Sequence, residues 1–196
     1  MGEGMIRTAT RRIGGQTSAS RAAMLDATER LMCDEGYAAV STRRVAAEAG
    51  LKPSLVHYYF PTTEDLFVAL YRRGAEQSLA RLELALASRR PLHALWRYSI
   101  DQGQTAVALE FMALASHRKG LSAEIGAHAE RLRAMQAGML ERLGGSMPSD
   151  CPPEGLSLIM AGIARALVME GGLGIASGHE AARQFVEAWI ERIEPT

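Results

Sequence analysis

The chain has 196 residues, 47% of them hydrophobic and 22% charged, which suits one folded domain or two small ones and excludes a disordered or fibrous protein. Basic and acidic residues balance at 22 each, so no overall positive field indicates a nucleic-acid partner, and any DNA-binding surface must be local. The two cysteines, Cys33 and Cys151, are far apart and lack the spacing of a metal or redox site.

The leading segment is locally basic. Arg7, Arg11 and Arg12 face only Glu3 there, and the surrounding Ala, Thr, Gly and Ser residues predict a flexible basic arm over residues 1–17. The segment lacks the apolar stretch of a signal peptide, and no uninterrupted apolar run in the chain reaches the roughly 18 residues of a membrane span. We therefore expect a cytoplasmic protein without a membrane partner.

The rest of the chain has a helical period, and no alternating β-branched run is long enough for a strand, so the predicted fold class is all-α. A first helix begins near residue 18 and ends at Gly36. Ser41 is placed to cap a second short helix over 42–49, and Pro53 suits the first turn of a third helix that runs to about residue 60.

A long fourth helix is predicted over 62–88, and it links the front of the chain to a second half that reads as a bundle of antiparallel helices. Further helices are expected at about 91–101, 104–118, 121–143, 153–173 and 178–193. The predicted domains are the arm at 1–17, a three-helix DNA-binding domain at 18–66, and a bundle at 67–196 for ligand binding and dimerisation.

Two short helices joined by Ala49, Gly50 and Leu51, after a longer bracing helix, make a helix-turn-helix. Val45, Ala46, Leu51 and Val56 are spaced to form its small shared core. This spacing directs a cation, a hydroxyl, an imidazole and a phenol outward, which are groups suited to base edges and phosphates. The outward side chains are Lys52, Ser54, His57 and Tyr58.

Residues 22 to 66, which include "LDATERLMCDEGYAAVSTRRVAAEAGLKPSLVHYYFPTTEDL", resemble the DNA-binding domain of the tetracycline-repressor (TetR) family. The resemblance covers about a quarter of the chain. It is specific because Gly36–Tyr37, Ser41–Thr42, Ala49–Gly50–Leu51 and the aromatic run at 58–60 occur in the family's order and spacing.

The resemblance implies that double-stranded DNA is the partner. Thr42 would hold a phosphate, Lys52 would be the best base reader, and the arm would lie along the backbone or in the minor groove. The implied DNA-binding residues are Thr42, Arg43, Arg44, Lys52, Pro53, Ser54, Leu55, His57, Tyr58, Tyr59 and Thr63. Two of them depart from the family, which commonly has Lys at the position of Thr63 and Tyr at that of His57. Losing one Lys–phosphate contact lowers the expected salt slope by about one.

In this family the second half encloses a pocket for a small-molecule effector. We expect its wall at Trp96, Phe111, Met112, His117, Met135 and Met139. Methionine adapts to varied apolar shapes, although each of these residues is also an ordinary candidate for core packing.

The last two helices predict a homodimer. The segment "LSLIMAGIARALVMEGGLG" is apolar nearly all round, unlike a monomer's surface helix, and the final helix has another wide apolar stripe. A buried core within one chain is the alternative. The expected interface residues are Leu158, Ala161, Gly162, Arg165, Phe185 and Trp189.

No catalytic or metal motif is complete: His179 and Glu180 begin a zinc-protease pattern, but Arg183 stands where the second histidine belongs. We expect no enzyme, metal or cofactor. The predicted function is a transcriptional regulator, most simply a repressor released from a pseudo-palindromic operator by a small apolar or amphipathic ligand. A helical ligand-binding protein with weak DNA affinity and a protein-interaction module remain the alternatives.

Overall fold

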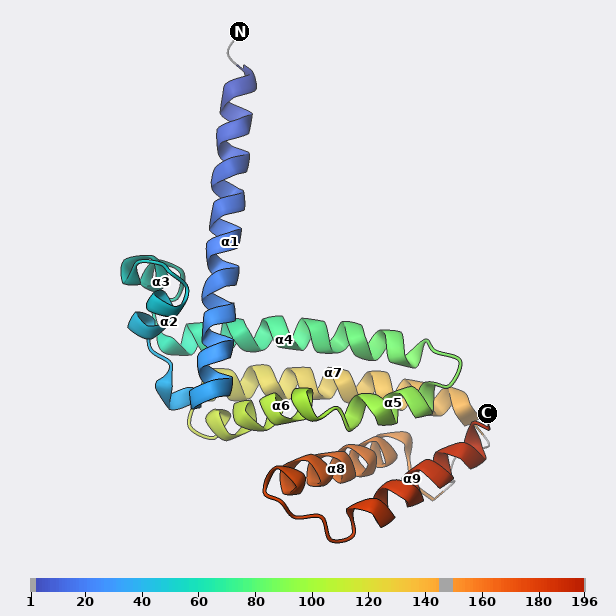
Figure 1. Cartoon of the computed structure of the whole chain (residues 1–196). Helices are drawn as coiled ribbons and strands as arrows, with labels where there is room; N and C mark the ends of the chain where they lie inside the picture. Colours follow the sequence, from blue (N-terminus) through green and yellow to red (C-terminus); the bar gives the residue numbers. More distant parts are fainter. Residues whose placement is uncertain (1–2, 145–149, 196) are drawn as a thin grey trace. The chain divides into compact units, whose positions relative to one another are not determined.

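The computed structural model describes residues 3–144 and 150–195, with side chains from residue 19 onward except 102 and 104–106. All the regular structure in these residues is helical, which confirms the predicted all-α class (Figure 1). The chain separates into two compact units that divide after Arg72.

The first unit contains α1 (Glu3–Glu35), a short 3₁₀ turn (Tyr37–Ala39), α2 (Thr42–Glu48), α3 (Pro53–Tyr59) and the start of α4 (Thr63–Leu86). Its core is formed by apolar side chains that are at most 7% exposed. These are Met24, Leu25, Ala27, Leu31, Met32, Val40, Val45, Ala46, Val56, Phe60, Leu66, Phe67 and Leu70.

The first helix begins earlier than the sequence suggests. Residues 3–17, expected as a flexible arm, have helical backbone as the first part of α1, so the predicted helix start near residue 18 is wrong. Extending a helix that is already nucleated fixes one residue for each added hydrogen bond. It therefore loses far less conformational entropy per hydrogen bond than starting a new helix does. The arm's side chains lie outside the described residues, and its contact with DNA stays a prediction.

The second unit contains the rest of α4 and five further helices: α5 (Pro91–Ser99), α6 (Gln102–Ala115), α7 (Lys119–Leu143), α8 (Pro153–Gly172) and α9 (His179–Ile193). Figure 1 shows α5 and α6 running alongside α7, with α8 and α9 packed below them. The shared core draws Leu82 from α4, Trp96 from α5, Met139 from α7, Met160 from α8 and Ile190 from α9.

Two polar contacts fix helix register inside this second unit. The Ser157 hydroxyl on α8 donates to Gln136 Oε1 on α7 at 2.5 Å, and both side chains are buried. The Tyr98 hydroxyl on α5 lies 2.5 Å from Ser78 Oγ on α4, and burial raises the pKa of Tyr98, so the phenol stays protonated at neutral pH. Buried polar groups of this kind specify one arrangement because any other leaves them unpaired.

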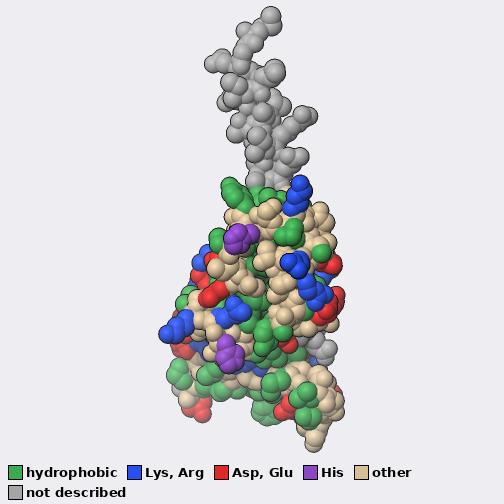
Figure 2. Space-filling view, turned by 90° about the vertical axis from the view of Figure 1, so that its left-hand side faces the viewer, with side chains coloured by type: hydrophobic (Ala, Val, Ile, Leu, Met, Phe, Trp, Pro, Cys, Tyr) green, Lys and Arg blue, Asp and Glu red, His purple; other side chains and the backbone are tan. Residues whose placement is uncertain are grey.

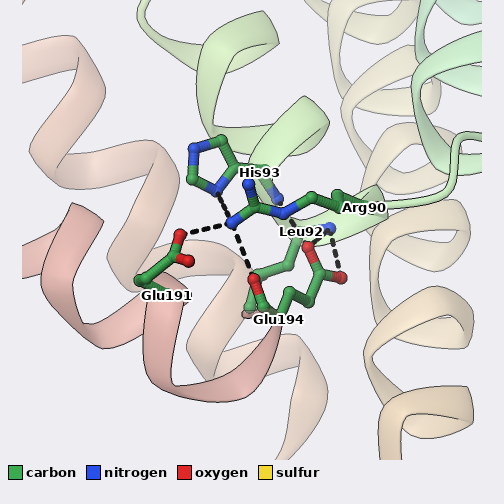
Figure 3. Close-up of polar contacts among 5 residues, drawn as sticks. All are labelled: Arg90, Leu92, His93, Glu191 and Glu194. Atoms are coloured by element: carbon green, nitrogen blue, oxygen red, sulfur yellow. Dashed lines mark hydrogen bonds and ion pairs between the residues drawn. The ribbon is translucent and has the colours of Figure 1, made fainter. Parts of the chain in front are cut away.

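The end of α9 closes onto the start of α5 (Figure 3). The Glu194 carboxylate accepts hydrogen bonds from the backbone N–H groups of Leu92 and His93, at 2.9 and 3.1 Å, and so caps α5 from 102 residues away in the sequence. The Arg90 Nη2 atom donates to Glu191 Oε2 and to the Glu194 carbonyl oxygen, and lies 3.1 Å from His93 Nδ1.

We expect Glu194→Ala to lower the free energy of unfolding of the second unit by about 1–3 kcal/mol, because two buried N–H groups lose their acceptor. Denaturant unfolding followed by tryptophan fluorescence measures this, since both tryptophans, Trp96 and Trp189, lie in the second unit. The control is Glu141→Ala, which removes an exposed carboxylate from α7. Equal midpoints for the two variants would contradict the capping role.

Helix α8 is long and apolar enough to cross a membrane by length and composition, and 28% of the tested window is buried in this chain. Glu154, Arg165 and Glu170 interrupt its apolar run, so no uninterrupted apolar stretch of this length appears in the sequence. The buried residues of α8 follow one face, as Leu156, Met160, Ala164 and Leu167. The exposed residues on other sides of the helix include Leu158 (49%), Ile159 (52%) and Met169 (51%).

Candidate nucleic-acid interface

The turn between α2 and α3 has the geometry of a helix-turn-helix. The Leu51 N–H bonds the Ala46 carbonyl at 2.8 Å and the Gly50 N–H bonds the Ala47 carbonyl at 3.2 Å, which is a Schellman motif closing α2. Gly50 has φ +65°, a conformation that glycine adopts without strain, and no neighbour would crowd a Cβ there. The Ser41 hydroxyl caps α2 by accepting from the Arg44 N–H, as the sequence predicts.

Ion pairs brace α2 against α1. The Arg44 guanidinium donates two hydrogen bonds to the Glu35 carboxylate, at 2.5 and 2.9 Å, and Arg30 Nε donates to Glu48 Oε1 at 2.9 Å. These contacts lower the pKa of Glu35 because the guanidinium hydrogen bonds favour the ionised carboxylate. Arg44 was predicted to contact DNA, but its guanidinium is occupied by Glu35 in this structure.

Because the folded-state pKa of Glu35 is lowered, the pair adds stability above the ordinary glutamate pKa and loses it as the pH falls through and below that value. We therefore expect wild type to be more stable than Glu35→Gln at pH 7, with the difference disappearing in acid. Thermal unfolding of both proteins over a pH series tests this. A difference that stays constant down to acid pH would show that the ionised pair contributes nothing.

Helix α3 directs its apolar residues inward and its polar residues outward. Val56 is 1% exposed and Phe60 4%, whereas Tyr58 is 76% exposed, with Lys52, Ser54 and His57 also at the surface. An open hollow of about 410 Å³ lies at the start of this helix. It is lined by Gly50, Leu51, Lys52, Ser54, Leu55 and Tyr58.

The residues predicted to bind DNA all keep exposed or half-exposed positions, on the start of α2, on α3 and at the start of α4. Within the described part of the chain, Arg43 and Lys52 make no ion pair, unlike Arg30 and Arg44. Figure 2 views the molecule from the side on which α2 and α3 lie in Figure 1. It shows Lys and Arg side chains scattered among hydrophobic and acidic ones on this face.

Thr63 is the first residue of α4 and is half-exposed. Its neighbour Thr62 holds the helix cap: the Thr62 hydroxyl accepts from the Asp65 N–H at 3.1 Å, and the Asp65 carboxylate accepts from the Thr62 N–H at 3.0 Å. With the cap at Thr62, substitution of Thr63 leaves α4 intact.

Residues 24–70 match the family model "Bacterial regulatory proteins, tetR family". The helix-turn-helix unit is therefore of the tetR type. This confirms the resemblance inferred from the motifs, and the family is one of transcriptional regulators. The chain is 28% identical to the HTH-type transcriptional regulator BetI of Rhizobium meliloti over 189 residues, covering 92% of this chain and 88% of the relative. It is 27% identical to BetI of Agrobacterium fabrum, with 90% and 91% covered.

Solved structures share the fold over most of the chain. A TetR transcription regulator from Haloarcula marismortui superposes with a TM-score of 0.74 at 21% identity, covering 89% of this chain and 97% of the other. A transcriptional regulator from Saccharomonospora viridis, solved in complex with choline, has a TM-score of 0.76 at 20% identity and covers 89% and 96%.

The six residues predicted for the effector pocket do not gather at one place. Trp96, Met135 and Met139 belong to the core of the second unit or pack against it, and Phe111 is buried on α6. Met112 is 51% exposed and His117 lies on the surface, so neither lines a closed interior in this structure. Met112 lies on α6, and His117 lies in the turn that follows α6.

The residues predicted for a dimer interface leave apolar surface on α8 and α9. Leu158, Gly162 and Arg165 are spaced by four and three residues on one side of α8, and Met169 continues this line. On α9, Phe185 is 70% exposed and Trp189 follows one turn later. A side chain as apolar as Phe185 at this exposure is typical of a surface that another molecule covers.

No group of three or more His, Cys, Asp or Glu residues that could hold a metal ion occurs in the described part of the chain. His179 pairs with Glu170 instead, with His179 Nε2 2.8 Å from Glu170 Oε2. This contact joins the end of α8 to the start of α9.

Proposed function

We propose that this tetR-family regulator is a cytoplasmic homodimeric repressor that binds a pseudo-palindromic operator and is released by a small-molecule effector in its second unit. The exposed set on α3 carries the proposal. Lys52, Ser54, His57 and Tyr58 form a surface of the right chemistry for base edges and phosphates, on a helix that the Schellman turn fixes against α2.

In this proposal α8 and α9 of two chains pair about a two-fold axis. A dimer of this kind presents two copies of α3, which must lie about 34–36 Å apart to enter successive major grooves. Helix α4 begins in the DNA-binding unit and ends in the core of the second unit, with Leu66 buried in the first and Leu82 in the second. An effector that shifts the second half of α4 would therefore change the spacing of the two α3 helices.

Release requires the effector to favour the non-binding state. A preference of about 3 kcal/mol for that state weakens operator binding by more than a hundredfold, since the two equilibria are linked. The choline complex of the Saccharomonospora viridis regulator supports choline as one member of the effector panel, beside apolar and amphipathic compounds.

The test is selection of bound sequences from a random duplex library by the purified protein at about 150 mM salt, where phosphate contacts alone no longer dominate. We expect enrichment of a palindrome whose half-site centres lie one or more helical turns apart. Titration of the selected duplex with each panel compound then detects release. Weak, salt-sensitive binding without any enriched sequence would favour the alternative, a helical ligand-binding protein that lacks useful DNA affinity.

Thr63→Lys restores the cation common in the family at the start of α4. We expect tighter operator binding at low salt and a steeper fall of log affinity with log salt, by about one per chain. The control is Ser122→Lys, which adds the same charge to an exposed position on α7. If both variants show the wild-type salt slope, Thr63 does not lie at a phosphate.

A further inference from the structure

Trp96 carries a buried hydrogen-bond donor without an acceptor. Its side chain is 1% exposed in the core of the second unit, and its indole Nε1 atom has no hydrogen-bond partner among the residues that the structure describes. An indole N–H can only donate, and a buried donor without an acceptor is disfavoured relative to one that has a partner. The position therefore offers a free energy gain to any acceptor that enters the core beside it.

The surroundings of Trp96 suit a small apolar molecule. The cluster that contains it includes Met139 and Met160, and Met135 packs against the same cluster. Methionine side chains are unbranched and flexible, so they can shift to admit a molecule that rigid β-branched side chains would exclude. The small side chain of Ala164 belongs to the same cluster.

The same surroundings do not suit an ion. The cluster is formed by hydrophobic side chains, and those packed on it include Tyr98 and Cys151. A charge entering such a region without a partner loses its hydration and gains little in return. The acceptor that suits Trp96 is therefore the oxygen of a neutral group, such as a ketone, ester or ether.

We propose that the effector is a neutral apolar molecule whose oxygen accepts a hydrogen bond from the Trp96 indole N–H. This deepens the proposed function and rests on it, because it assumes that the second unit binds the effector. It assigns Trp96 the role of selecting for an acceptor, and it places choline, a permanent cation, outside the preferred class.

The experiment uses three probes on the full chain: acetophenone, α-methylstyrene, which replaces the carbonyl of acetophenone with an isosteric alkene, and choline. Proton–nitrogen correlation spectra give one indole signal for each of the two tryptophans, and Trp96→Phe identifies the signal of Trp96. The signal of Trp189 is the reference within each spectrum. Binding affinities come from titration calorimetry on wild type and variants.

The expected result has three parts. Acetophenone moves the Trp96 indole proton downfield, as a new hydrogen bond does, and binds more tightly than α-methylstyrene. Trp96→Phe lowers the affinity for acetophenone about three- to tenfold, the range of one net hydrogen bond, while leaving the affinity for α-methylstyrene within about twofold. The control Tyr98→Phe, which removes a hydroxyl already bonded to Ser78, leaves the preference for acetophenone unchanged.

Several results would overturn the proposal. One is equal affinity for acetophenone and α-methylstyrene, and another is tighter binding of choline than of either. A third is a Trp96 indole signal that is already hydrogen-bonded in the free protein and unmoved by acetophenone, which would indicate a buried water as the partner. Absence of acetophenone binding would also count against it. The repressor proposal is tested separately, because operator selection needs no effector.

Discussion

Lys52→Ala is expected to lower affinity for the selected operator by about ten- to a hundredfold while the oligomeric state and the melting temperature stay at wild-type values. Lys52 is exposed at the start of α3 and makes no ion pair with any described residue, so its removal costs the folded chain nothing that the structure shows. A lysine that reads a base edge contributes about 1–3 kcal/mol of discrimination, which corresponds to this range.

The measurement is a set of binding titrations on the operator and on single-base variants of each half-site. If Lys52 reads a base, the variant loses discrimination at one position of each half-site. If it holds only a phosphate, the variant weakens binding to all sequences about equally and flattens the salt dependence. Lys119, the other lysine of the chain, lies on α7 and provides the matched control, Lys119→Ala. Unchanged operator binding by Lys52→Ala would show that α3 does not read bases through Lys52.

Phe185→Glu is expected to convert the proposed dimer to a monomer at micromolar concentration. Phe185 is 70% exposed on α9, so the substitution leaves the core of the chain intact, but it puts an unpaired carboxylate into an apolar contact between two chains. A penalty of about 3–5 kcal/mol weakens dimerisation by at least about a hundredfold. Operator affinity falls with it, since a monomer reads only one half-site.

Sedimentation velocity across a concentration series measures the dissociation constant of the dimer. The control is Ser122→Glu, which adds the same charge to an exposed position on α7. A wild-type sedimentation coefficient for Phe185→Glu would show that Phe185 lies outside the dimer interface. The exposed apolar residues of α8 and α9 would then require another partner.

The ends of α2 and α3 and their buried residues in the first unit were predictable because the sequence features that determine them are local. Ser41 caps α2, Pro53 begins α3 and Gly50 closes the turn, each for a reason that concerns only a few adjacent residues. The buried positions of α2 and α3 follow from their spacing alone. The exposed set on α3 then follows by exclusion, since Val56 already marks the inward face.

Contacts between distant residues were not predictable in the same way. Nothing near Glu194 in the sequence indicates that it caps a helix 102 residues earlier, and nothing near Arg44 indicates that Glu35 will hold its guanidinium. The exposed positions of Met112 and His117, both expected in the pocket wall, were also not predictable. A helix that is apolar on most sides gives a weak indication of its inward face, and only packing against α7 decides it.

The closing contact between α9 and α5 also constrains how the protein is made. The first 72 residues contain their own core and can fold while the ribosome is still translating the remainder. The start of α5 must wait until another 102 residues have been synthesised, because the carboxylate that caps it belongs to Glu194. Nascent chains arrested between α5 and α9 should therefore hold a folded DNA-binding unit beside an unfinished bundle that is a ready substrate for chaperones.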